Sequence, residues 1–251
     1  MTMNIKFLKE KIFFNKKSPL KYIYFFINKI ISIFAYKKSY SQGSMDLILN
    51  HIFKNKIDGF YIDVGCQHPI KNNNTYLLFK KGWTGINIDL DNVNIDLFNF
   101  FRPKDNNINS AISNKVEKVK LFYYHQKSPI NTLDEKISLK QQAKIEKKID
   151  IQTNTLENIL DNYSIKTIDL LTIDVEGFEL KVLNGLNFDK YKPSVIIVEF
   201  LDLEAKKWEI PYNNLDNVLK SEIYRFLINK NYKLVNWVNG DLVFIKKNYS
   251  Y

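Results

Sequence analysis

The sequence is poor in residues that cross-link a chain or break its regular structure. Its 251 residues include one cysteine, six prolines and eight glycines. A single cysteine, Cys66, excludes an intramolecular disulfide and a zinc site built from several cysteines, and it fits a reducing cytoplasm. Because 45% of the residues are hydrophobic, the chain has enough apolar side chains for a folded core, and its length suits one α/β domain with additions.

Acidic residues are too few to balance the lysines, and the imbalance is local. The net charge is +10, and residues 1–40 hold nine lysines against the single acid Glu10. The rest of the chain is therefore close to neutral. A nucleic-acid enzyme is usually basic over its working face, so we expect no nucleic-acid partner.

Residues 1–40 are predicted to form a basic amphipathic helical extension. Lys29 would lie in the middle of a membrane span, which disfavours one, and no small-residue cleavage site of a signal peptide follows. Two interpretations stay open: the helix packs on the domain or on a partner subunit, or it rests on the anionic inner face of a membrane. The apolar stripe consists of Leu20, Ile23, Tyr24, Ile27, Ile31 and Phe34.

Residues 41–251 alternate apolar strands with amphipathic helices, which predicts an α/β domain. Segment 113–150 interrupts this alternation and is interpreted as an insertion or lid. The chain ends in two apolar runs joined by Asn239-Gly240, a strong hairpin signal. The expected strands are 60–64, 86–88, 107–112, 116–124, 168–174, 194–200, 232–238 and 242–246; the expected helices are 45–53, 75–81, 92–101, 135–149, 155–163, 176–186 and 215–231.

Two strand ends in the first half carry residues that suit a nucleotide-like ligand. Gly65 follows the strand that delivers Asp63, and it permits a tight turn and a close approach of the backbone. The dinucleotide fingerprint G-x-G-x-x-G fails because Gln67 stands at its second glycine. Asp89 ends the next strand, where a carboxylate can accept hydrogen bonds from both ribose hydroxyls.

Two later strand ends also carry acids. Asp174 ends one apolar strand and Glu199 ends the next, while Glu176 lies just beyond Asp174. In open α/β folds ligands bind at this carboxyl edge of the sheet. Acids gathered there disfavour a phosphate and favour a cation such as the sulfonium and ammonium groups of S-adenosylmethionine.

The stretches DVGCQHPIKNNNTYLLFKKGWTGINID and LLTIDVEGFELKVLNGL resemble the FkbM family of S-adenosylmethionine-dependent methyltransferases. The resemblance implies a class I methyltransferase (Rossmann-like) fold, with a seven-stranded, mostly parallel sheet and an antiparallel terminal hairpin, over residues 41–251. It implies O-methylation of a hydroxyl, commonly on a sugar of a glycan or a secondary metabolite, with a small-molecule, lipid-linked or nucleotide-linked acceptor. The cofactor-binding residues would be Asp63, Gly65, Cys66, Asn74, Thr75, Asp89, Ala111, Asp174 and Glu176.

A sugar hydroxyl needs a base, for which His68, Asp174 and His125 are the candidates. No metal is expected; in the alternative, Asp174 and Glu199 hold Mg²⁺. Two other functions stay open: a nucleotide-dependent oxidoreductase or epimerase, which needs glycines that the chain lacks, and a non-catalytic scaffold of a polysaccharide-assembly complex. The expected location is the cytoplasm, with peripheral membrane contact through residues 1–40 left open, as is a homo-oligomer.

Overall fold

The computed structural model describes residues 22–23, 25–27, 29–30, 38–141, 143–163, 165–201 and 214–249. The chain divides into two units, Met1–Lys38 and Ser39–Tyr251. In the first unit the described residues 22–23, 25–27 and 29–30 are helical, and most of the predicted N-terminal helix lies outside the described residues. In the part of the chain that the structure describes, no helix has the length and hydropathy needed to cross a bilayer.

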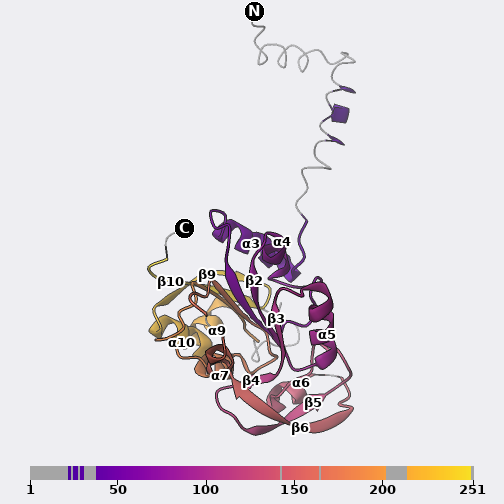
Figure 1. The fold of residues 1–251 in the computed structure, drawn as a ribbon, viewed down its shortest axis with the longest axis vertical. Helices are drawn as coiled ribbons and strands as arrows, with labels where there is room; N and C mark the ends of the chain where they lie inside the picture. Colours follow the sequence, from indigo (N-terminus) through magenta and orange to yellow (C-terminus); the bar gives the residue numbers. More distant parts are fainter. Residues whose placement is uncertain are drawn as a thin grey trace, which may run out of the picture. The chain divides into compact units, whose positions relative to one another are not determined.

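A seven-stranded sheet forms the centre of the second unit (Figure 1). Strand β10 runs antiparallel to both of its neighbours, and the other neighbouring strands pair in parallel. This confirms the predicted mostly parallel sheet with an antiparallel terminal hairpin, and Asn239 in the hairpin turn has a φ of 53°. In spatial order the strands are β3 (Asn106–Asn109), β2 (Thr84–Asp89), β1 (Phe60–Val64), β7 (Leu170–Ile173), β8 (Val195–Glu199), β10 (Asp241–Lys246) and β9 (Tyr232–Val238).

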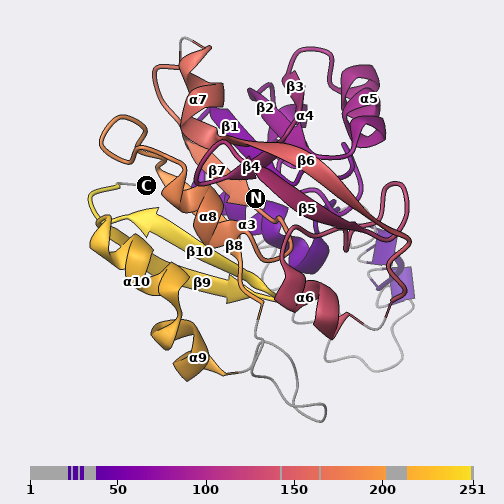
Figure 2. The same cartoon turned by 90° about the horizontal axis from the view of Figure 1, so that it is seen from below.

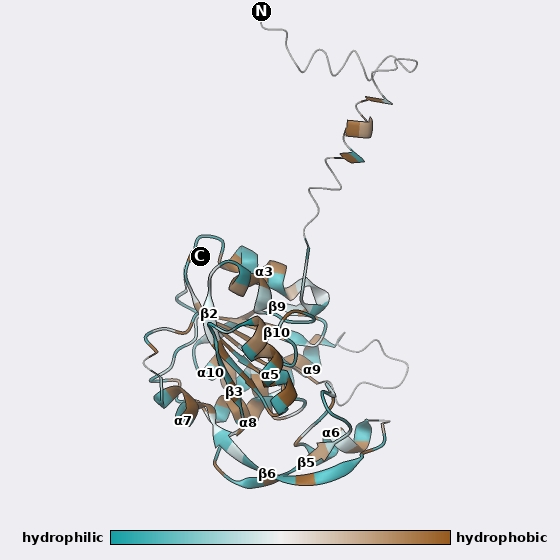
Figure 3. Ribbon diagram, turned by 45° about the vertical axis from the view of Figure 1, so that its right-hand side comes forward, coloured by the Kyte–Doolittle hydropathy of each residue, from teal (hydrophilic) through white to brown (hydrophobic). Residues whose placement is uncertain are grey.

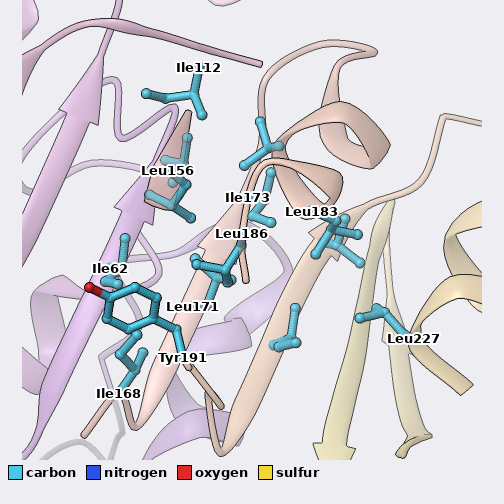
Figure 4. Packing of buried hydrophobic residues seen from close by; sticks show 14 of the residues in the cluster. Ile62, Ile112, Leu156, Ile168, Leu171, Ile173, Leu183, Leu186, Tyr191 and Leu227 are labelled. Carbon is cyan, nitrogen blue, oxygen red and sulfur yellow. The ribbon is translucent and has the colours of Figure 1, made fainter. Parts of the chain in front are cut away.

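Helices pack on both faces of this sheet because successive strand residues point to opposite sides. In β1, Ile62 and Val64 join a core cluster with α7, α8 and α10 (Figure 4), whereas Tyr61 joins a second cluster with α3 and α4. The strands of the central sheet are mostly hydrophobic, whereas the helices around them carry both polar and hydrophobic residues (Figure 3). The helices are η1 (Gln42–Ser44), α3 (Met45–Ile52), α4 (Tyr76–Lys80), α5 (Asn92–Phe101), α6 (Glu135–Lys140), α7 (Leu156–Asp161), α8 (Glu179–Asn184), α9 (Leu215–Lys220) and α10 (Glu222–Asn229).

Segment 113–150 contributes to a small second sheet, of order β4-β6-β5. Its strands are β4 (Ala111–Ser113), β5 (Lys118–Tyr123) and β6 (Lys147–Thr155). The prediction of one strand over 107–112 was therefore wrong, because Ser110 separates β3 in the main sheet from β4 in the second. The helix predicted over 135–149 was also wrong: α6 ends at Lys140, and the alternating residues of β6 pair with β5. Cross-strand pairing overrides the helical tendency of these lysines.

Two other helix boundaries differ from the prediction. The helix expected over 215–231 is two helices, α9 and α10, of which α10 lies beside β9 (Figure 2). Ser221 separates them in an extended conformation, and its side chain caps α10 by accepting from Tyr224 N at 3.1 Å. The helix expected from Glu176 begins at Glu179, because Glu176 and Gly177 have φ of 55° and 105°.

Candidate active site

The ends of β1, β2 and β7 meet at Gly65. Its N–H donates to Ile88 O at 2.8 Å, and Asp174 N donates to Val64 O at 2.9 Å. Gly65 has a φ of 82°, and a Cβ at this position would lie 1.7 Å from Asp174 O. The close approach predicted for Gly65 is thus made to the neighbouring strand end, and it brings the tip of β7 against the turn after β1.

Asp89, at the end of β2, is held by three donors. Its Oδ2 accepts from Gln67 N at 2.9 Å, and its Oδ1 accepts from Asp91 N at 2.7 Å and from Asn94 Nδ2 at 3.2 Å. Burial raises the pKa of Asp89, and these hydrogen bonds act in the opposite direction. The carboxylate therefore fixes the loop after Gly65 and the start of α5 on either side of one cavity.

Asp63 belongs to a buried network behind that loop. Its Oδ2 accepts from Thr75 Oγ1 at 2.9 Å and from Asn73 Nδ2 at 3.1 Å. Arg102, fully buried, donates to Thr75 Oγ1 at 2.8 Å and to Pro69 O at 2.9 Å. Burial raises the pKa of Asp63 to about 6, with the Arg102 charge as the main opposing effect. This network stabilises the loop, and Asp63 and Thr75 do not line the cavity.

Two more of the predicted cofactor residues lie outside the lining of the cavity. Cys66 is buried beside Ile95 and Phe98, and burial raises the pKa of its thiol well above the ordinary value. Asn74 forms a hydrogen bond with the carboxyl of Asp241. Their predicted contact with a cofactor stays a prediction.

The acids at the ends of β7 and β8 converge. One carboxylate oxygen each of Asp174, Glu176 and Glu199 lies within 4.8 Å of the others. Burial, then the Asp174 charge, raises the pKa of Glu199 to about 12 and that of Glu176 to about 8. Burial of the carboxyl group raises the pKa of Asp174, and the hydrogen bond that it shares with Glu199 acts in the opposite direction.

The acid cluster, meaning Asp174, Glu176 and Glu199, therefore lacks positive partners among the described residues. Carboxylates this close cannot all ionise unless a cation joins them, so without one they retain protons. One buried oxygen of Glu199, Oε2, has no hydrogen-bond partner among the described atoms. Such a cluster can hold either protons or a cation, which includes a metal ion because carboxylate oxygens are ligands that Mg²⁺ prefers.

A tight turn holds Glu176 toward the cluster. Glu176 has a φ of 55°, which is uncommon for a residue with a long side chain. Its carbonyl accepts from Thr132 Oγ1 at 2.6 Å, and Glu179 Oε1 accepts from Val175 N at 3.1 Å and from Gly177 N at 2.9 Å. Strain of this kind persists only where the surroundings hold it, and it is common at functional sites.

The cavity runs from Asp89 to the acid cluster and has a volume of about 310 Å³. Residues 125–133, here called the strap, close one side of it. Lys127 N of the strap donates to Asp91 Oδ2 at 2.6 Å, and Thr132 binds Glu176 O as described above. Lining residues include Gln42, Val64, Gly65, Gln67, Asp89, Leu90, Asn94, Ala111, Ile112, Ser128, Pro129, Asn131, Leu133, Asp174, Glu176 and Glu199.

The two candidate histidines do not line this cavity. Nδ1 of His68 accepts from Ile70 N and Lys71 N, each at 3.1 Å, so the neutral ring carries its proton on Nε2. Burial and the charge of Lys127 lower the pKa of His68. In this arrangement Nε2 of His68 can donate a hydrogen bond, but it cannot take the proton of an acceptor hydroxyl. His125 is exposed, with Nδ1 2.9 Å from Gln126 O.

Sequence reasoning missed Asp241 as a member of this region. Asp241 opens β10 and pairs in register with Glu199. Burial and the charge of Asp174 raise its pKa to about 7. The hairpin signal could have found it, because the first residue of an antiparallel strand lies at the edge where its parallel neighbours end. The strap lies within segment 113–150, which the sequence indicated as an insertion or lid, whereas Asn94 had no comparable signal.

A sheet of order β3-β2-β1-β7-β8-β10-β9, with one antiparallel strand and a cavity at its carboxyl edge, defines the class I methyltransferase fold. The family profile described as Methyltransferase FkbM domain matches residues 51–234. The chain therefore belongs to the FkbM methyltransferase family and is an S-adenosylmethionine-dependent methyltransferase.

Other comparisons are distant. The crystal structure of a TehB-like SAM-dependent methyltransferase from Corynebacterium glutamicum is similar to this chain at 13% identity, covering 92% of this chain and all of that one, with a TM-score of 0.41. A search of curated protein sequences finds no match.

Proposed function

We propose that this methyltransferase transfers the methyl group of S-adenosylmethionine to a hydroxyl of a sugar, in a glycan or a related metabolite. The acid cluster at one end of the cavity, whose ligand oxygens lie within 4.8 Å of one another, supports the cofactor of this proposal. The sugar hydroxyl is the acceptor that the resemblance to the FkbM family implies. A phosphate-bearing cofactor would be repelled there, whereas a sulfonium and an α-ammonium group would be attracted.

The donor set of the cavity fits this cofactor. The orphaned Glu199 Oε2 lies at the end where positive charge is wanted, and Asp89 lies at the other. Between them Leu90, Ala111 and Ile112 give an apolar wall suited to a nucleobase. When bound, S-adenosylmethionine would supply the electrophilic methyl group.

The residues of the chain would then orient the acceptor and take its proton. Aligning two reactants is a large part of such catalysis, and a positioned base adds about 10²–10⁴-fold. Of the three predicted bases, Asp174 lines the cavity and has an exposed side chain. We therefore assign proton removal to Asp174. His68, whose Nε2 already carries a proton, is not assigned this step.

Methyl transfer without a metal is the simpler form of this proposal. The alternative, in which Asp174 and Glu199 hold Mg²⁺, rests on the same oxygens. Turnover that is unchanged by excess EDTA would support the metal-free form. Activity lost with EDTA and restored by Mg²⁺ alone would establish the alternative.

Mass spectrometry of surface glycans tests the sugar acceptor. Glycans from a deletion strain should lack the mass of one methyl group at a defined sugar, and the wild-type gene should restore it. An Asp174→Asn gene should fail to restore it while expressing a folded protein. Identical glycans in both strains would contradict the sugar acceptor, and full rescue by Asp174→Asn would favour the scaffold alternative.

A nucleotide-linked or lipid-linked sugar is the acceptor class to test first with purified protein. Contact with an anionic membrane through residues 1–40 stays a prediction. Sedimentation with anionic liposomes, comparing the full chain with a deletion of residues 1–38, would test it, and equal sedimentation of both would remove it.

A further inference from the structure

Besides Glu199 Oε2, two buried polar atoms of residues that line the cavity have no hydrogen-bond partner among the described residues. They are Asn94 Oδ1 and Ser128 Oγ. The side chains are 3% and 7% exposed, and both residues line the cavity. Buried polar atoms in folded proteins are usually paired, so two unpaired ones beside a cavity indicate a ligand that completes them.

The amide of Asn94 has a fixed orientation. Its Nδ2 donates to Asp89 Oδ1 at 3.2 Å. Turning the amide over would bring its oxygen against that carboxylate, so Oδ1 is the atom left for a ligand. Since this oxygen can only accept, the ligand must present an N–H or O–H group.

Ser128 is held on the same side of the cavity. The preceding residue, Lys127, donates its N–H to Asp91 Oδ2, while Asp91 Oδ1 caps α5 by accepting from Val93 N at 2.9 Å. The strap is thereby joined to the first turn of the helix that carries Asn94. The hydroxyl of Ser128 can donate as well as accept.

The neighbouring walls are apolar and suit a flat ring. Pro129 and Leu133 come from the strap, Leu90 directly follows β2, and Ala111 and Ile112 belong to β4. An adenine ring between these walls presents an amino group beside a ring nitrogen at its edge. The amino group would donate to an acceptor such as Asn94 Oδ1, and the ring nitrogen would accept from a hydroxyl.

We propose that Asn94 Oδ1 and Ser128 Oγ read the amino edge of the cofactor's adenine, so that the site rejects the deaminated base. The proposal rests on the proposed function, whose cofactor it deepens. Hypoxanthine carries a carbonyl oxygen in place of the amino group. That oxygen would face the fixed Oδ1 of Asn94, and two acceptors cannot bond.

Calorimetric titration with S-adenosylhomocysteine and with S-inosylhomocysteine tests this reading. One unsatisfied buried acceptor corresponds to about a 10- to 100-fold loss, so wild-type protein should bind the inosine form that much more weakly. Ser128→Ala should weaken the binding of both ligands about 5- to 10-fold and keep the preference, because a hydroxyl can donate to the bare ring nitrogen of adenine and accept from the N–H that hypoxanthine carries at that position. Its melting temperature should not fall, because the hydroxyl has no protein partner to lose.

Ser138→Ala is the matched control, because this buried serine of α6 donates to Glu135 O and lies outside the cavity lining. It should leave both affinities unchanged. Equal binding of the two ligands by wild type would overturn the proposal. If a 2′-deoxy analogue lost affinity as well, Asn94 Oδ1 and Ser128 Oγ would be assigned to the ribose instead of the adenine. Binding of S-adenosylhomocysteine that is unchanged by Ser128→Ala would also overturn the proposal. If neither ligand bound folded wild-type protein, the proposed function itself would fail.

Discussion

Replacing Glu199 by glutamine should reduce the loss of folding stability that the protein without cofactor shows as the pH rises. In the folded protein Glu199 has a pKa of about 12, because it is buried beside Asp174, Glu176 and Glu179. In the unfolded chain a glutamate ionises near its ordinary pKa of about 4.3. Between these two values the folded state therefore binds one more proton at this site than the unfolded state does. The contribution of Glu199 to the free energy of unfolding is therefore largest below its pKa in the unfolded chain, and it falls as the pH rises above that value.

The size of the effect follows from linkage. One extra proton in the folded state lowers the free energy of unfolding by about 1.4 kcal/mol for each pH unit. From pH 5.5 to pH 8.5 the Glu199 site alone corresponds to about 4 kcal/mol. Glutamine cannot ionise, and its NH₂ group can still donate to Asp174. Glu199→Gln should therefore remove most of this slope.

Urea unfolding at pH 5.5, 7.0 and 8.5 measures the slope, with fluorescence of the buried Trp83 as the probe. Wild type should lose stability more steeply than Glu199→Gln, and the variant should be the more stable protein at pH 8.5. Glu146→Gln, at an exposed position of the second unit, should follow wild type. Parallel slopes for wild type and Glu199→Gln would refute the protonated cluster.

Two further substitutions test the frame of the site. Gly65→Ala should abolish binding of S-adenosylhomocysteine and lower the melting temperature, because its Cβ would lie 1.7 Å from Asp174 O. Gly82→Ala is the control: its Cβ would meet no atom within 4 Å, although Gly82 has a φ of 97°. This variant should lose only about 1 kcal/mol of the free energy of unfolding and should keep binding. Arg102→Leu should lower the free energy of unfolding by about 3–5 kcal/mol in urea titrations, because it leaves Asp63 buried without its cation; a loss below about 1 kcal/mol would show that the network contributes little.

The central sheet could be predicted from the sequence because its signals are local. Runs of branched apolar residues, such as the one in Val195–Glu199, predict buried strands, and Asn239 in the final turn predicts the hairpin. The second sheet was hidden because its pairing is not local. Strand β6 finds its partner β5 across the strap, and no residue spacing within 135–149 announces that contact.

The acids of the site could be predicted for the same local reason, since Asp174 and Glu199 lie at the ends of apolar strands and Glu176 lies two residues after Asp174. The sequence did not predict how many acids meet at this point, because Asp241 belongs to β10, which runs antiparallel to the strands that carry the other acids. The sequence also does not separate residues that line the cavity from those behind it. Asp63 and Asp89 stand in equivalent motifs, yet Arg102 makes one the anchor of a buried network while the other borders the cavity.

Titration of S-adenosylhomocysteine into the purified protein tests the central claim most directly. We expect binding in the micromolar range, and its loss in Asp89→Ala, because Asp89 fixes Gln67 and Asn94 around the cavity. Asp96→Ala, an exposed acid of the same helix α5 that follows Asp89, should bind like wild type. Absence of binding to folded wild-type protein, or unchanged binding by Asp89→Ala, would contradict the site described here.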